Sequence, residues 1–390
     1  MNMNLSKMNP TWIIWIMTFG TFGILSTELG FIGILPQVAN FFSVSIDQAG
    51  LFLSCFSLII AVGSLFIPIV VSKYNRRHLF ILVLGVMTLF SFIGGLMTNF
   101  YLALLCRIIP AFFYPAYVSL TFTVAGELVP SNETPKAVSK LVIGVSAGSI
   151  FGVPLSTIFA NYGGYPWAMF FFGFLNLISL IVTILFFPSI EGNNDVSLKG
   201  QLRHVGSGVF ILSCIGVIIF AAGFNTYYSY ASAFLQGICG IIGSNLSLIL
   251  FIYGIMSIPG SWLAGRLLIK YPLRTVVLCP LLICVNLAIF YFVNDSWTLM
   301  YIFMATFGVL EGIFNNIIQF WIFSSIPEAP EFANGVFMSM LNIGITIGTF
   351  IGGLIIVDVG MSAIIIGAII ILIISMIFFI IRSQLYPNHT

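Results

Sequence analysis

Long apolar runs dominate the chain, and short polar segments that hold most of the charges separate them. A helix needs about 20 consecutive apolar residues to cross a bilayer, and twelve such windows can be placed along this sequence. They cover residues 11–35, 48–72, 78–97, 99–126, 138–160, 166–188, 205–226, 230–268 (loop included), 274–293, 297–325, 333–357 and 360–382. This pattern predicts an all-α integral membrane protein with twelve transmembrane helices.

The longest hydrophilic interval runs from Glu191 to Arg203 and divides the predicted spans into six and six. We therefore expect an N-terminal six-helix bundle over residues 1–190, a cytoplasmic linker over 191–204 and a C-terminal six-helix bundle over 205–390. A duplicated architecture of this kind places the two bundles about a pseudo-two-fold axis.

Glycine stripes of the same spacing occur once in each half, half a chain length apart. Their members are Gly144, Gly148 and Gly152 in the first half, and Gly344, Gly348 and Gly352 in the second. Residues four apart share one helix face, and such small-residue stripes allow close packing in any membrane bundle. The repetition favours a transporter built from two halves. We expect the stripes to mark two equivalent helices at which the two bundles approach closely.

The composition supports a membrane location, since 60% of the residues are hydrophobic and only 6% are charged, against about 25% charged in soluble domains. The first apolar run, Trp12 to Leu35, is too long for a signal-peptide core and is expected to remain as the first span. No basic patch of the size that nucleic-acid binding needs is present. The six cysteines form no CxxC pair, and we interpret them as buried reduced thiols. No metal site is therefore expected.

The basic residues fit one orientation of the predicted spans. If both termini are cytoplasmic, twelve of the thirteen Lys and Arg residues fall on the cytoplasmic side, and Arg107 alone lies inside a span. The predicted outer loops hold only acids, such as Asp47, Asp295 and Asp358. The positive-inside rule therefore predicts a multi-pass cell-membrane protein with both termini in the cytoplasm.

Three segments resemble the major facilitator superfamily, in particular its drug/proton antiporter branch with the sugar-efflux and arabinose-efflux-type permeases. The segments are Ser26 to Gly50 in the first two helices, Cys106 to Pro115 in the fourth, and Gly144 to Pro154 in the fifth. The resemblance covers essentially the whole chain and implies alternating access by a secondary transporter. It also implies that the first and fourth helices line one central cavity.

Two segments depart from the motifs of that superfamily. In the loop after the second helix, Arg76 and Arg77 are kept, which implies a gating role, but Ser72 stands where the motif has Asp. In the fifth helix the usual Gly-Pro pair is split as Gly152-Val-Pro154. Pro154 remains a candidate helix bend, while the antiporter signature is less complete than in the family.

Ionisable side chains inside a membrane are costly, at about 2.5–3.5 kcal/mol or more at a helix centre. Only Glu28, Arg107 and Glu311 lie well away from the ends of the predicted spans. Glu28 and Arg107 should both lie roughly 12 Å below the outer ends of their helices, so they can meet across one cavity. Glu28 is then a proton-binding carboxylate that stays ionised beside Arg107 and is protonated when separated from it. The alternative is a permanent buried ion pair that only fixes packing.

Glu311, Asn315 and Gln319 follow one another at intervals of four and share one helix face. Lipid cannot satisfy such a polar stripe, so it must face a wet cavity or polar partners. Glu311 is a candidate second proton site or substrate anchor. The alternative is an interhelical hydrogen bond without a transport role.

Other polar side chains are candidates for substrate contact, namely Tyr114, Thr121 and Asn225, together with Asn315 and Gln319. Packing, lipid contact or the interfacial aromatic belt explains the aromatic members equally well.

No nucleotide-binding loop, HExxH or GxSxG motif occurs in the chain, so an enzyme is not expected and no cofactor is needed. The remaining energy source is an ion gradient. We predict a monomeric, proton-coupled exporter of a small organic compound, either drug-like or a metabolite. A sugar or nucleoside-like metabolite exporter or symporter is the alternative within transport, and a non-transporting membrane sensor is the alternative outside it.

Overall fold

The computed structural model describes residues 9–130, 133–192, 207–292, 296–328 and 330–386, and within these ranges the regular elements are all helices. Most of the predicted linker lies outside the described residues. The helices are α1 (Pro10–Phe42), α2 (Ile46–Val71), α3 (Arg76–Leu96), α4 (Phe100–Glu127), α5 (Thr134–Phe186), α7 (Gly208–Tyr228), α8 (Ala231–Gly237), α9 (Gly243–Lys270), α10 (Pro272–Phe292), α11 (Trp297–Phe323), α12 (Pro330–Asp358) and α13 (Ala363–Leu385).

Eleven helices in the described part of the chain are long and apolar enough to cross a membrane. The difference from the twelve predicted windows arises in α5, which covers both 138–160 and 166–188. Its 53 residues are interrupted by non-helical backbone at Gly163 and Gly164. Gly164 has a φ of 72°, which glycine adopts at little cost. The break lies between the two windows that the sequence predicts as separate spans.

The first helix continues to Phe42, beyond the predicted end at Leu35, although Pro36 lies inside it. Proline has no N–H and leaves the carbonyl four residues earlier without its helical donor. That carbonyl belongs to Ile32, and it accepts a hydrogen bond from the hydroxyl of Ser232 in α8. A contact with the second half of the chain thus replaces the missing bond inside α1.

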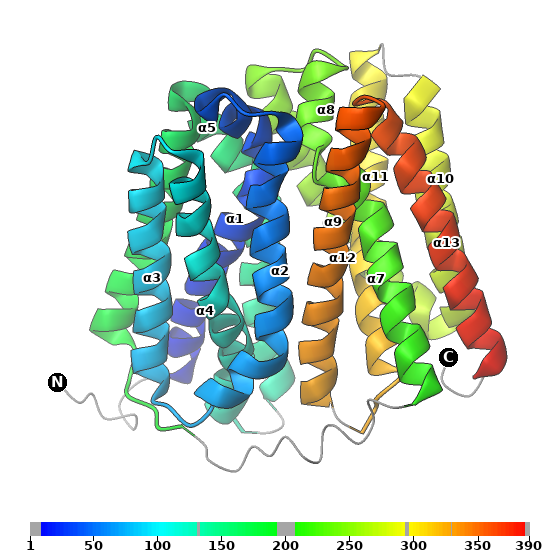
Figure 1. Ribbon diagram of the computed structural model, residues 1–390. Coiled ribbons are helices and arrows are strands. Elements are labelled where there is room, and N and C mark those ends of the chain that lie inside the picture. The colour runs from blue at the N-terminus through cyan, green and yellow to red at the C-terminus, as the bar shows by residue number, and fades with distance from the viewer. Residues whose placement is uncertain (1–8, 131–132, 193–206, 293–295, 329, 387–390) are drawn as a thin grey trace.

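The helices run roughly side by side, with α1–α5 on one side of the molecule and α7–α13 on the other (Figure 1). We call these groups the first half and the second half. The start of α1 and the end of α13 lie at the same end, and α8 lies at the opposite end, here called the α8 end. The hydroxyl of Thr346 in α12 donates to the carbonyl of Ser54 in α2 at 3.2 Å, which joins the halves along one seam. Along the other, the rings of Phe151 and Phe251 lie 5.6 Å apart.

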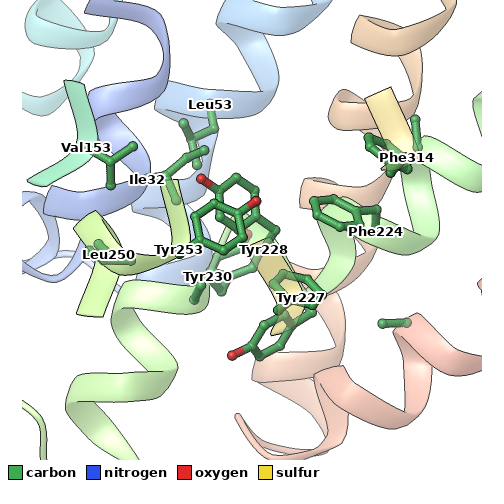
Figure 2. Close-up of a cluster of buried hydrophobic side chains, with 14 of the residues drawn as sticks. Ile32, Leu53, Val153, Phe224, Tyr227, Tyr228, Tyr230, Leu250, Tyr253 and Phe314 are labelled. Atoms are coloured by element: carbon green, nitrogen blue, oxygen red, sulfur yellow. The ribbon is translucent and has the colours of Figure 1, made fainter. Parts of the chain in front are cut away.

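A buried apolar cluster fills the region between the halves (Figure 2). Ile32, Leu53 and Val153 reach it from α1, α2 and α5, and they meet Leu250 of α9 and Tyr228 of α7. Van der Waals packing of these side chains stabilises contact between the two halves within the membrane.

The glycine stripes lie inside the halves, whereas the sequence predicts them at the contact between the halves. A Cβ on Gly152 would lie 2.7 Å from the Cα of Ser26 in α1. In the second half a Cβ on Gly352 would lie 2.7 Å from the carbonyl oxygen of Thr226 in α7. The helices α5 and α12 do border the other half, but through other faces. Small residues are needed here because α5 and α12 pack backbone to backbone on α1 and α7.

These glycine contacts repeat between the halves at residue numbers 200 higher. Gly144 meets the carbonyl oxygen of Thr18 and Gly344 that of Ile218. Gly148 approaches the carbonyl oxygen of Phe22, and Gly348 that of Ala222. The pairs α1–α5 and α7–α12 therefore pack in the same register.

Tyr230 closes the α8 end of the contact between the halves. Its hydroxyl donates to the carbonyl oxygen of Thr349 at 2.9 Å. The same side chain occupies the space beside Gly50 of α2 and Gly353 of α12, where any Cβ would collide with it. Next to it, the hydroxyls of Ser229 and Thr349 share a hydrogen bond of 2.7 Å.

Candidate functional site

A small cavity of about 40 Å³ lies between the halves. Residues from both halves line it: Glu28, Leu29, Ile32, Leu53, Phe56, Ser57, Arg107, Asn225, Tyr228, Ser229 and Ile345. This volume has room for a few water molecules, whereas small-molecule sites are usually about 300–1,000 Å³. The halves must therefore move apart before an organic compound can enter.

Arg107 reaches this cavity from α4 and is 3% exposed. Its Nη1 donates to the carbonyl oxygen of Thr27 at 2.7 Å, and its Nη2 donates to that of Glu28 at 2.9 Å. The guanidinium also lies 4.0 Å from the ring centroid of Phe31 and 3.8 Å from that of Phe56. Two hydrogen bonds and two cation–π contacts fix the charge in one position.

Glu28 and Arg107 come together as the sequence predicts, but the main chain of α1 makes the contact. The Glu28 carboxylate does not come within 4.0 Å of the guanidinium, and instead interacts with the hydroxyl of Tyr114. A proton can consequently join or leave the carboxylate without breaking the bonds that hold Arg107 to α1.

Glu311 forms a separate polar group in the second half, outside the lining of the cavity. Its Oε1 accepts a hydrogen bond of 2.8 Å from Nδ2 of Asn315, and the carboxylate interacts with Ser257 of α9. No Lys or Arg in the described ranges forms an ion pair with it. Gln319, two turns further along α11, is exposed, so the predicted polar stripe runs from the half-buried Glu311 to an exposed position.

Of the other residues predicted to contact substrate, some lie at the cavity and others lie away from it. Asn225 lines the cavity while its Nδ2 donates to the carbonyl of Ala221 at 2.9 Å. Tyr114 is buried beside Glu28. The hydroxyl of Thr121 is buried and donates to the carbonyl of Tyr117 at 2.7 Å, away from the cavity lining.

Tyr228, which follows Asn225 in a cluster of aromatic residues at the end of its span, lines this cavity, whereas Ser57 and Ser229 are lining residues that the sequence does not single out. Serines are frequent in membrane helices, and no feature of the local sequence separates these two from the others. The 200-residue offset between the two halves could have identified two of the lining residues, because it makes Tyr228 and Ser229 the equivalents of Glu28 and Leu29.

Arg76 and Arg77 bind the main chain of the first half. Arg76 is 1% exposed, donates from Nη1 to the carbonyl of Ser72 at 2.6 Å, and lies 4.0 Å from Glu127. Arg77 donates to the carbonyl of Ile184 at 2.6 Å. Pro154 is buried in α5, one turn beyond Ile150, whose backbone packs on Gly254 of α9.

A bundle of apolar helices with a cavity between its two halves, lined by apolar side chains together with Glu28, Arg107 and Asn225, is typical of a membrane transporter. The chain belongs to the Major Facilitator Superfamily, whose sequence profile matches residues 14–329 and 212–389.

The relatives and solved structures that resemble the chain are also transporters. A "Probable sugar efflux transporter" of Helicobacter pylori (strain G27) is 25% identical over 358 residues, which cover 90% of this chain and 89% of the relative. The fold resembles a bacterial homolog to human lysosomal transporter Spinster, in an inward-facing and occupied conformation, with a TM-score of 0.77, 16% identity, and coverage of 97% and 98%. It also resembles the nucleoside transporter NupG, with a TM-score of 0.76, 14% identity, and coverage of 97% and 99%.

Proposed function

We propose that the protein is a proton-coupled antiporter that exports a small organic compound by alternating access. Transport of small molecules follows from the family, while coupling and direction are our inference from the site. Export is supported by the sugar-efflux name of the relatives and by the antiporter-like glycine stripe of α5.

The proposal includes a topology of twelve spans in two six-helix bundles related by a pseudo-two-fold axis. The break at Gly163 and Gly164 divides α5 into two spans, and the repeated glycine contacts support the symmetry. The bundles are 1–190 and 205–390, and both termini are cytoplasmic. In this arrangement the α8 end is the outer end, and it is closed.

One observation carries the coupling mechanism, namely that Arg107 is bonded to the main chain beside Glu28 and not to the carboxylate. The carboxylate is thus available to a proton inside a cavity that both halves line. We infer that Glu28 binds a proton when the cavity faces outward and releases it when the cavity faces the cytoplasm. Substrate entry from the cytoplasm follows that release, so one proton enters as one substrate leaves.

The second half offers neutral groups to the same cavity: the Asn225 amide, the Tyr228 phenol and the Ser229 hydroxyl. Such groups suit the hydroxyls of a sugar or nucleoside-like metabolite, which is our second candidate beside a drug-like compound. The sugar-efflux name of the relatives favours the metabolite.

The test is flux of a substrate panel in proteoliposomes under an imposed pH difference, with wild type beside Glu28→Gln. We expect wild-type flux to follow the pH difference, and the variant to exchange substrate without responding to it. Glu133→Gln, at an exposed position, is the matched control and should behave as wild type. A Glu28→Gln protein with full pH-driven flux would refute coupling through this residue.

A further inference from the structure

Three cations surround the junction between α9 and α10: Arg266, Lys270 and Arg274. We call them the basic turn. All three are exposed, and none forms a hydrogen bond or an ion pair with another described residue. Since α9 begins beside α8, the basic turn lies at the end of the molecule opposite the α8 end.

The partners of the basic turn are aromatic rings, which leave the charges uncompensated. Arg266 stacks 3.6 Å from the ring centroid of Trp262. Lys270 and Arg274 flank the single ring of Tyr271, at 5.1 and 5.6 Å from its centroid. Gathering like charges around one ring costs free energy unless an anion lies between them.

The corresponding turn between α2 and α3 in the first half is arranged differently. There Arg76 and Arg77 bind carbonyl oxygens of the protein, and Arg76 also faces the carboxylate of Glu127. The arginines of the basic turn have no such partners in the described chain, so the anion that matches them must come from outside it.

The helix face beside the basic turn is exposed and apolar, as expected of a surface that meets lipid. Leu248, Ile255, Trp262 and Ile269 are exposed and follow one another at intervals of seven, which forms one apolar stripe along α9. The opposite face packs on α11, where a Cβ on Gly260 or Gly312 would collide with backbone of the neighbouring helix. Arg266 lies one turn beyond Trp262 on the exposed side, so its charge meets the layer of lipid headgroups.

We propose that Arg266, Lys270 and Arg274 bind the phosphate of an anionic phospholipid headgroup, whose acyl chains lie along the exposed stripe of α9. The continuous apolar stripe selects a lipid over a free phosphate. The site is independent of the transported compound and of proton coupling.

Binding can be measured by native mass spectrometry of the full-length protein, delipidated and then titrated with phosphatidylglycerol or phosphatidylcholine. We expect phosphatidylglycerol to bind more tightly and added salt to reduce the difference. Each juxtamembrane cation contributes about fivefold in affinity, so the double variant Arg266→Gln/Arg274→Gln should lose about 25-fold. The charge-retaining double Arg266→Lys/Arg274→Lys should keep most of the affinity and shows that the turn tolerates substitution.

A control removes two exposed cations elsewhere, in Lys73→Gln/Lys136→Gln, and should bind phosphatidylglycerol as wild type does. If Arg266→Gln/Arg274→Gln binds phosphatidylglycerol with unchanged affinity, the proposed site is wrong. Glycerol phosphate that binds as tightly as the lipid would instead show that the acyl chains contribute nothing, and would overturn the assignment to lipid.

Discussion

Ser232 donates its hydroxyl hydrogen to the carbonyl oxygen of Ile32, the acceptor that Pro36 leaves without a helical donor. The bond crosses from the second half to the first at the α8 end, beside the Tyr230 side chain that fills the space between α2 and α12. A proline inside one half thus creates the acceptor for a contact that holds both halves together.

Ser232→Ala should therefore favour conformations that are open at the α8 end. A buried carbonyl left unpaired costs about 1–3 kcal/mol, which is at least about fivefold in the population of the closed state. A cysteine introduced in the cavity by Ser57→Cys, labelled with a membrane-impermeant maleimide and followed by mass spectrometry, should react correspondingly faster. Ser383→Ala is the control, because that hydroxyl forms an exposed hydrogen bond within its own helix, to the carbonyl of Ile380. Equal labelling in Ser232→Ala and Ser383→Ala would contradict this prediction.

Arg107→Lys should destabilise the protein although the charge is kept. A lysine cannot donate to the carbonyls of Thr27 and Glu28 in the same geometry or stack as a plane on Phe31. The expected loss is about 2 kcal/mol or more, visible as a lower unfolding temperature in detergent. The same substitution at exposed Arg274 should leave that temperature unchanged. If both variants unfold like wild type, the contacts of Arg107 do not stabilise the fold.

Gly152→Ala should disturb the packing of α5 on α1, because the added Cβ would lie 2.7 Å from the Cα of Ser26. Backbone on both sides prevents a side chain from simply moving away, so the helices must separate. Gly85→Ala in α3 is the matched control, since a Cβ there meets nothing within 4 Å. The control gains up to about 1 kcal/mol of helix propensity. Opposite shifts of the two unfolding temperatures are expected, and a stabilised Gly152→Ala would be inconsistent with this close contact.

Glu311→Gln should separate a transport role from a packing role. Glutamine can keep the bond to Asn315 and removes a half-buried carboxylate that has no cation beside it in the described structure. We therefore expect the variant to be at least as stable as wild type and to transport more slowly. Thermal unfolding and proteoliposome flux measured on the same preparation test this. A fall in stability together with normal flux would leave Glu311 a structural residue only.

Much of the fold follows from the apolar runs, because the length of a span is fixed by the bilayer. Where a helix ends at a different residue from the predicted span, tertiary contacts determine its end. Residues 36–42 continue α1 since Ser232 satisfies the carbonyl of Ile32, and a distant hydroxyl cannot be inferred from the residues around Pro36. The division of α5 at Gly163 and Gly164 was visible only as a gap between two windows.

The site was predictable in part for a similar physical reason. Charges inside apolar runs identify Glu28, Arg107 and Glu311, because such groups are rarely kept without a purpose. The same rule cannot tell which atoms a charge contacts, and so the main-chain partners of Arg107 were not foreseen. Likewise, the glycine stripes indicate close packing but not which neighbouring helix receives them.

The repeated register of α1–α5 and α7–α12 has a consequence for the chemistry of the cavity. Applied to the lining, it makes Tyr228 the counterpart of Glu28 and Ser229 the counterpart of Leu29, and all four residues face the same space. Equivalent positions thus carry an acid on one wall and a phenol on the other. A solute held between them would meet an ionisable surface on one side and a neutral hydrogen-bonding surface on the other. In the mechanism proposed above, the first half would bind the proton through Glu28, and the equivalent positions of the second half would bind the transported compound.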